Sequence, residues 1–365
     1  MNPLQIQLYR FSFWLAPLVA FSFWRGTTYA LADPGSGWWM WWAVIVTYAI
    51  IPVLDVLFGQ VVTRFSPDDQ SRLARDPMLR AIPWVCGGVW LLTLAWAIAL
   101  LPQVIVLPWW QIVGFVLSLG VVGGILAINV GHELIHRNHK AERLFGGVLL
   151  ASVCYGVFKV EHVRGHHLRV GTADDPATAR INESAYTFVP RAIAGTYVHG
   201  WRLERDRLAR AGHHGFQALL RNETLHWSLL SVAFGVGVFA VLGAAALIIF
   251  LVAGLVAIVE LELVDYIEHY GLTRSVDASG KLEAVRYEHS WDYAGWLTNA
   301  LLINLQRHSD HHAHGGRAFG ALNSHPEAPQ LPASYAAMLL AALVPPLYRR
   351  IIHPRLRLDR DAAFG

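Results

Sequence analysis

Histidines gather in three short stretches of this chain, and their spacing is typical of metal ligands. The stretches read HELIH, EHVRGHH and RHSDHH. Within each stretch the histidines are adjacent or three or four residues apart, so on a helix their rings can share one face and converge on one point. Neutral imidazole is a ligand for iron, copper and zinc. Three stretches in one chain predict a site for more than one metal ion. The eight histidines are His132, His136, His162, His166, His167, His308, His311 and His312.

Carboxylates accompany these histidines, and others fall within or at the ends of apolar stretches. An ionisable group at membrane depth is costly, so a functional partner is the first hypothesis for it. The usual partner is a ligating imidazole, whose second N–H the carboxylate accepts. We expect this role for Asp55, Glu133, Glu161, Glu262, Asp265, Glu268 and Asp310. For Asp55 the alternative is a simple cap of a helix end at the membrane interface.

The composition indicates an integral membrane protein. The chain has 365 residues, of which 55% are hydrophobic and only 15% charged, and its mean hydropathy is +0.38. A helix that crosses a bilayer needs about 20 apolar residues. Such segments cover 11–30, 38–58, 81–101 and 109–130, and the block 225–264 is twice as long and should form a hairpin near Gly243. The predicted fold is all-α, with six transmembrane helices and a cytoplasmic histidine-rich di-metal region.

Basic residues give the expected orientation and the division of the chain. The turns 33–37 and 102–108 contain no Lys or Arg, whereas 64–80, 137–221 and the region after Asp265 contain many. We therefore place both ends and all histidine stretches in the cytoplasm. The predicted parts are transmembrane helices 1–4 (1–136), a cytoplasmic histidine-rich region with an interfacial helix (137–224), transmembrane helices 5–6 (225–269) and a cytoplasmic C-terminal region that completes the metal site (270–365).

Other cofactor classes find little support in the sequence. Two cysteines, Cys86 and Cys154, are too few for an iron–sulfur cluster or a disulfide framework. The nearest approach to a dinucleotide fingerprint is Gly235 and Gly237 inside an apolar span, where packing of helices explains small residues better, as it does for Gly120 and Gly124. Reducing equivalents must then come from elsewhere, and no nucleic-acid partner is expected.

Two rival functions can be set against oxidation chemistry. HELIH fits the H-E-x-x-H helix of zinc peptidases, but an intramembrane protease needs one zinc and leaves at least five histidines unexplained. A metal transporter or sensor needs ligands in mid-membrane, and these spans have almost none. Metal content would separate the three classes: two irons, one zinc or variable loading.

Five motifs carry a resemblance to a known family. They are GHELIH (131–136), EHVRGHH (161–167), DPAT (175–178), YIEHYGL (266–272) and LQRHSDHHA (305–313). With them the chain resembles the membrane-bound di-iron proteins that include fatty acid desaturases and hydroxylases, and it is most similar to the alkane 1-monooxygenases. It departs from them at Arg137, where Lys is common, at Asp265, where Asn is common, and over 289–293.

The resemblance implies a ligand set, a reaction and partners. It makes His269 the ninth ligand, with two iron ions, O₂ as co-substrate and no need for a bridging carboxylate. The implied reaction converts the terminal methyl of medium-chain n-alkanes to a primary alcohol in the bacterial inner membrane. Electrons would come from rubredoxin, with rubredoxin reductase upstream, and membrane lipid surrounds the chain. The nearest alternative is a fatty acid ω-hydroxylase or another hydrocarbon-chain hydroxylase or desaturase of this superfamily.

A stripe along the second predicted span is our candidate for a substrate channel wall. Its members, Thr47, Ile51, Leu54 and Phe58, recur at i, i+4, i+7 and i+11 and run toward the expected metal site. Ordinary helix packing explains such a stripe equally well.

Overall fold

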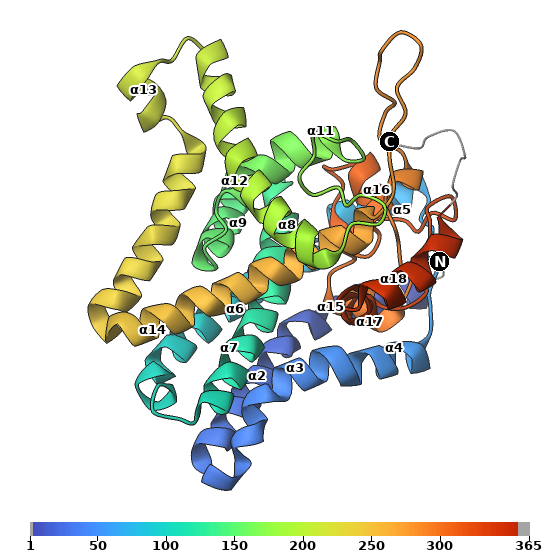
Figure 1. Cartoon of the computed structure of the whole chain (residues 1–365). Coiled ribbons are helices and arrows are strands. Elements are labelled where there is room, and N and C mark those ends of the chain that lie inside the picture. Colours follow the sequence, from blue (N-terminus) through green and yellow to red (C-terminus); the bar gives the residue numbers. More distant parts are fainter. Residues whose placement is uncertain (1–2, 357–365) are drawn as a thin grey trace.

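The computed structural model describes residues 3–356, and helices dominate that part of the chain (Figure 1). The described residues form only isolated β-bridges and no β-strand. The all-α prediction is therefore confirmed. The chain begins with a continuous helical stretch made of α1 (Pro3–Ser12), the 3₁₀ helix η1 (Phe13–Leu18) and α2 (Val19–Ala32).

Four helical segments among the described residues are long and apolar enough to cross a membrane. The first runs Gly35–Phe58 and comprises most of η2 (Pro34–Trp41), then α3 (Trp42–Ile45), η3 (Val46–Ile50) and α4 (Ile51–Phe58). The second is α6 (Pro77–Val104), and the third, Trp109–Ile135, joins α7 (Trp109–Gly123), η4 (Gly124–Asn129) and α8 (Val130–Ile135). The fourth is α14 (Glu223–His269). The predicted span at 11–30 is not among them; a 3₁₀ segment containing Pro17 interrupts it.

The predicted hairpin near Gly243 is confirmed. Gly243 has φ 79° and ψ −172°, so α14 is two helices that meet at this residue, and Figure 1 shows the yellow and orange halves joined at a sharp corner. Only glycine adopts this backbone conformation without strain. The 47-residue element therefore has the length and the turn needed for two passes through a bilayer.

Small residues let the orange half of α14 approach α7 closely. A Cβ atom at Gly120 would lie 2.5 Å from Val256 Cβ and 2.9 Å from the Ala253 carbonyl oxygen. The predicted packing role of Gly120 is thus correct. At Gly237 no other part of the chain lies within 4 Å of the position that a Cβ atom would occupy, so contacts within the chain do not account for this glycine.

Further elements complete the described part of the chain. They are α5 (Pro67–Ala74), α9 (Lys140–Ser152), α10 (Phe158–Glu161), η5 (His162–His166), α11 (His167–Arg169), α12 (Ala185–Arg210), α13 (Gly215–Leu220), η6 (Tyr287–His289), α15 (Trp296–Leu301), α16 (His308–Ala313), η7 (Phe319–Ala321), α17 (Tyr335–Ala342), α18 (Pro345–Ile352) and η8 (His353–Arg355). The helix expected at the membrane surface, α9, packs on α8, where Gly146 faces the Gly131 carbonyl, and on Trp227 of α14.

Candidate metal centre

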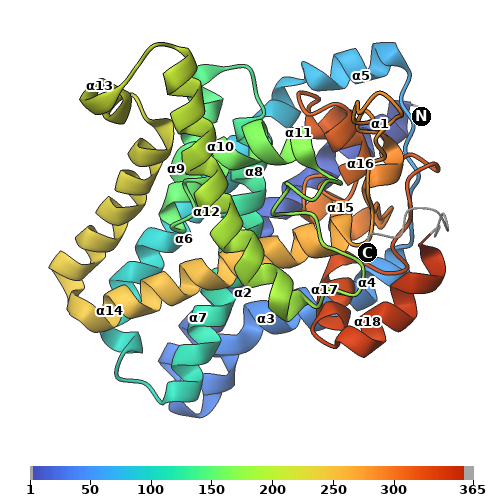
Figure 2. The same cartoon turned by 45° about the horizontal axis from the view of Figure 1, so that its top comes forward.

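Four separated segments bring the nine predicted histidines together. His132 and His136 lie at the end of α8, His162, His166 and His167 on η5 and α11, His269 at the end of α14, and His308, His311 and His312 on α16. Figures 1 and 2 both show the helices α8, α11 and α16 near one another. All nine side chains are buried except those of His136 and His167, which are half-buried.

The histidines form two groups. In each group every residue offers one ligand atom, and these atoms all lie within 4.8 Å of one another. The five-histidine group is His132, His136, His162, His167 and His311. The four-histidine group is His166, His269, His308 and His312.

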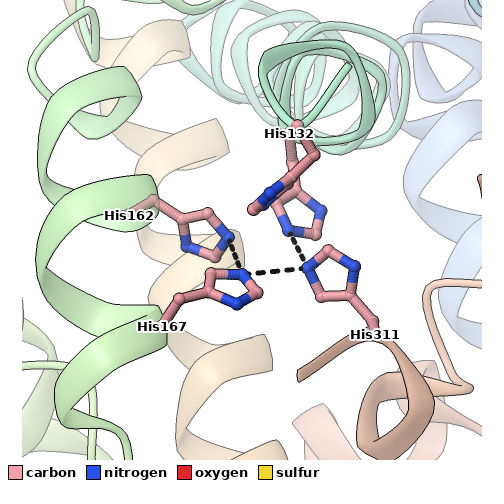
Figure 3. A group of neighbouring side chains, drawn as sticks. His132, His162, His167 and His311 are labelled. Atoms are coloured by element: carbon pink, nitrogen blue, oxygen red, sulfur yellow. Dashed lines mark hydrogen bonds between the residues drawn. The ribbon is translucent and has the colours of Figure 1, made fainter. Parts of the chain in front are cut away.

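Within each group the Nε2 atoms face one another. In the five-histidine group the Nε2 of His311 lies 3.0 Å from that of His132 and 3.1 Å from that of His167, and Figure 3 shows these rings and that of His162 turned toward a common centre. In the four-histidine group the Nε2 of His312 lies 2.9 Å from that of His308 and 3.2 Å from that of His166.

The sequence motifs correspond to the groups only in part. His132 and His136 of the first motif converge on one group as expected, but the second and third motifs are each divided between the two groups. His162 and His167 belong to the five-histidine group, while His166, between them, belongs to the other. The cause is the wide π turn of η5, which brings residues five apart, His162 and His167, to the same side. On α16 the i, i+4 pair His308 and His312 shares a group, and His311 points to the other.

The donor set fits two metal ions. Burial lowers the pKa of His311 to about 3 and holds that of His162, His167, His308 and His312 well below 6.5. These rings are therefore neutral, and each has one N–H and one lone pair. Several nitrogens that converge within about 3 Å cannot all satisfy one another by hydrogen bonds. The Nε2 of His136 is buried with no hydrogen-bond partner, which is what a ligand atom would look like without its cation.

Asp175 orients His166 and is the partner that sequence reasoning missed. Its Oδ2 lies 2.9 Å from His166 Nδ1 and accepts a 2.6 Å hydrogen bond from Thr178 Oγ1. The carboxylate fixes which nitrogen of His166 faces the group. Both Asp175 and Thr178 belong to the DPAT motif, so the signal was present in the sequence without an assigned role. A second orienting contact joins His269 Nδ1 and the His289 carbonyl oxygen at 3.3 Å.

Glu268 reaches the four-histidine group directly. Its Oε2 lies 3.2 Å from His308 Nε2, and Tyr335 of α17 donates a 2.7 Å hydrogen bond to Oε1. Asp265 and Glu268 each place an oxygen within 4.8 Å of a ring nitrogen of His269. The structure thus offers carboxylate oxygen at the edge of this group, in addition to the histidines that the resemblance implied.

Four of the other predicted carboxylates contact groups other than the clustered imidazoles. Glu133 pairs with Arg137 at 2.5 Å and accepts a bond from Phe319 N. Asp310 pairs with Arg317 at 2.5 Å, accepts a bond from Asn323 N and lies 3.2 Å from His325 Nε2.

The remaining two lie deeper in the helical core. Glu262 accepts a bond from Tyr155, and Glu161 Oε1 lies 3.7 Å from His199 Nδ1. Glu133, Asp310 and Glu262 therefore bond to neighbouring segments. Glu161 Oε1, by contrast, is buried without a hydrogen-bond partner among the described residues.

Asp55 ties the candidate span Gly35–Phe58 to the C-terminal region. Its Oδ1 accepts a 2.9 Å bond from Thr298 N, and its Oδ2 a 3.0 Å bond from Thr298 Oγ1. Thr298 lies in the first turn of α15, so Asp55 caps that helix from 243 residues away in sequence.

The four residues of the predicted channel stripe do not all lie on a buried face. Thr47 and Ile51 are buried, but Leu54 is half-buried and Phe58 is 57% exposed. The π turn η3, just before Pro52, contains one more residue per turn than an α-helix. Ile51, Asp55 and Phe58 all follow this turn on the regular helix α4, where Ile51 and Asp55 are buried and Phe58 is the exposed last residue.

Long apolar helices, together with nine histidines that converge in two groups, define a helical protein of membrane type with a histidine cluster suited to metal. The sequence profile of the fatty acid desaturase family matches residues 107–341. Alkane 1-monooxygenase 2 of Alcanivorax borkumensis is 40% identical over 94% of this chain and 89% of its own length. Alkane 1-monooxygenases 1 and 2 of Pseudomonas aeruginosa are 37% and 36% identical, each over 95% of this chain and 91% and 94% of their lengths.

The chain belongs to the fatty acid desaturase family and, within it, groups with the alkane 1-monooxygenases. The predicted resemblance is confirmed.

Proposed function

We propose that the nine histidines hold two iron ions and that the chain hydroxylates the terminal methyl of medium-chain n-alkanes to primary alcohols. The observation that carries the proposal is the division of the histidines into groups of five and four, each with ligand atoms within 4.8 Å. One zinc, as in a peptidase, would leave a whole group without a role. The names of the relatives, alkane 1-monooxygenases at 36–40% identity, supply the reaction class.

An unactivated methyl group offers nothing to an acid or base, so bound iron with O₂ would supply the oxidising power. The described side chains supply position. Asp175 and the His289 carbonyl orient two rings, and the helices around the groups exclude water. A terminal product requires a geometric restriction, because internal C–H bonds are weaker than those of the methyl group.

Electrons would come from rubredoxin, itself reduced by rubredoxin reductase. The chain has two cysteines, Cys86 in α6 and Cys154 after α9, and no dinucleotide fingerprint. It therefore lacks the residues of an internal relay from NADH.

The proposed setting is the inner membrane of a bacterium, with six spans and the histidines on the cytoplasmic side. Two of the spans are the halves of α14, and the sixth is the N-terminal helical stretch Pro3–Ala32, which is as long as a span although interrupted. Lys and Arg concentrate on the side of the histidines. An alkane dissolved in the bilayer would enter between the helices.

Metal and product analysis of the purified protein tests the proposal. We expect two irons per chain after growth in iron-replete medium, and 1-alkanol from a medium-chain alkane with O₂ and reduced rubredoxin but none with NADH alone. His269→Ala should lose most of the activity, whereas His214→Ala, at an exposed position, should retain it. One zinc with negligible iron, or hydroxylation of fatty acids with none of alkanes, would contradict the proposal.

A further inference from the structure

The last two α-helices enclose a hollow that the proposed reaction does not use. It has a volume of 690 Å³ and lies between α17 and α18. Most of its lining is aliphatic, including Ala337, Leu340, Ala341 and Leu347. Arg350 and Arg355 are the only charged residues among those that line it. An apolar hollow with two guanidinium groups has the chemistry of a site for an anionic amphiphile.

The position of α17 places this hollow beside the membrane. The helix packs against α14 and against η3 and α4, which belong to the candidate span Gly35–Phe58. Figures 1 and 2 both show α17 and α18 next to α4. Leu340, Leu343, Val344 and Leu347 are each 41–51% exposed and extend the apolar surface outward. Such a surface next to a membrane helix is expected to contact lipid.

The arginines are available to a ligand. Arg350 is exposed, and among residues 3–356 neither it nor Arg355 forms an ion pair. The guanidinium of Arg355 donates a 2.6 Å bond to the Ile351 carbonyl oxygen, and within residues 3–356 this is the only hydrogen bond that its side chain forms. Guanidinium binds phosphate through paired N–H donors. Arg349 precedes Arg350 on α18 and adds a third positive charge nearby.

We propose that this hollow binds one anionic phospholipid. An acyl chain lies against Ala337, Ala341 and Leu347, and the phosphate is held by Arg350 and Arg355. The proposal rests on charge and on position. Arg350 and Arg355 line an apolar hollow whose helix α17 packs against a candidate membrane span, and the headgroups of a bilayer leaflet carry negative charge.

Native mass spectrometry of the full chain released from detergent micelles tests the site. The protein is incubated with phosphatidylglycerol or with phosphatidylcholine of the same acyl chains. We expect preferential retention of phosphatidylglycerol, and about a fivefold loss of it in Arg350→Gln, since one basic residue near an anionic headgroup contributes about that factor. The matched control is Arg75→Gln, which removes an exposed arginine after α5 and should leave retention unchanged.

A second variant tests the apolar part, and four outcomes would overturn the proposal. Ala337→Trp should reduce retention of both lipids while the circular dichroism spectrum stays helical. Equal binding of the two lipids, equal loss in Arg350→Gln and Arg75→Gln, or displacement of the lipid by inorganic phosphate at millimolar concentration would exclude an anionic phospholipid site. So would a lipid-free dimer that Ala337→Trp dissociates, because a second copy of the chain would then be the occupant.

Discussion

The contact between Asp175 and His166 shows how single residues prepare the site. A carboxylate that accepts the Nδ1 proton of an imidazole fixes the ring and leaves Nε2 for the metal. Asp175 is buried and stands next to Asp174, which is exposed. The two neighbouring aspartates allow the same substitution to be compared at Asp175, which contacts His166, and at the exposed Asp174.

We expect Asp175→Asn to weaken metal binding by roughly 10- to 100-fold and to lower hydroxylation accordingly. The amide keeps the size of the carboxylate but removes the charge that stabilises the oriented imidazole. Iron retained during competition with a chelator measures the effect. Asp174→Asn is the control, and equal iron retention by the two variants would remove Asp175 from the site.

The neutral rings also predict a dependence of stability on pH. Burial places the folded-state pKa of His162, His308 and His312 well below the usual 6.5, and that of His311 near 3. As the pH falls below 6.5, the unfolded chain therefore binds protons that the folded chain does not bind. Each such group lowers the free energy of unfolding by roughly 1.4 kcal/mol for every unit that the pH falls below 6.5, until the pKa of the folded state is reached.

Chelator-treated protein should accordingly show a Tm that falls steadily from pH 7 to pH 5. Thermal unfolding in one detergent at several pH values measures this slope. His311→Ala should make the slope shallower, and His214→Ala should leave it as it is. A Tm that is constant over this range would mean that the rings are not held neutral by burial.

At the scale of elements, π turns decide which way side chains point. One stands in η3 before Pro52, one in η4 before α8, and one carries the second histidine motif. Each advances the helix by an extra residue in one turn, which rotates everything that follows. Residues five apart, such as His162 and His167, are then brought to one side of the helix.

Ile51→Trp tests whether the buried half of the stripe lines the route of the substrate. Ile51 is only 8% exposed, so an indole there would shorten any channel along this face. We expect activity to shift toward shorter alkanes relative to longer ones. Phe58→Trp, at a position that is 57% exposed, should leave the ratio unchanged.

The measurement is the ratio of the hydroxylation rates on short and long alkanes, with each rate normalised to bound iron. Overpacking alone would cost roughly 1–3 kcal/mol of stability and lower activity on all substrates alike. An unchanged ratio in Ile51→Trp would therefore make the stripe an ordinary packing surface.

At the scale of the whole molecule, the two histidine groups link parts of the chain that are far apart in sequence. His132 of α8 and His311 of α16 are 179 residues apart and belong to one group. Metal bound there would connect the long helices to the C-terminal region, so binding free energy becomes folding free energy for that end of the molecule.

Removal of metal should therefore loosen that end first. We expect a chelator to lower the Tm and to raise amide hydrogen exchange in η5, α11 and α16, with little change in α2, which carries no histidine of either group. Hydrogen exchange with mass spectrometry measures this, and restored iron should reverse it. Exchange that rises equally in α2 would mean that the metal stabilises the whole fold and not one end.

The sequence by itself determined what depends on local chemistry. Imidazole spacing and the family resemblance together identified all nine histidines of the two groups, hydropathy identified three of the apolar segments and the long block of α14, and Gly243 marked the corner within that block. Most of these follow from residues a few positions apart, because a helix turn, an apolar run and a glycine turn are short-range properties. The N-terminal segment 11–30 was harder to predict because Pro17 and a 3₁₀ turn interrupt it.

Only the tertiary structure decided how these parts meet. It divided the histidines into groups of five and four, and it brought Asp175 into contact with His166 and Asp55 into contact with Thr298. It also placed α17 beside a candidate membrane helix. These relations join residues far apart in sequence, 243 positions for Asp55 and Thr298, and they depend on distances that change when one π turn rotates a helix. Spacing in the sequence does not contain that rotation, because it arises from the packing of the helices against one another.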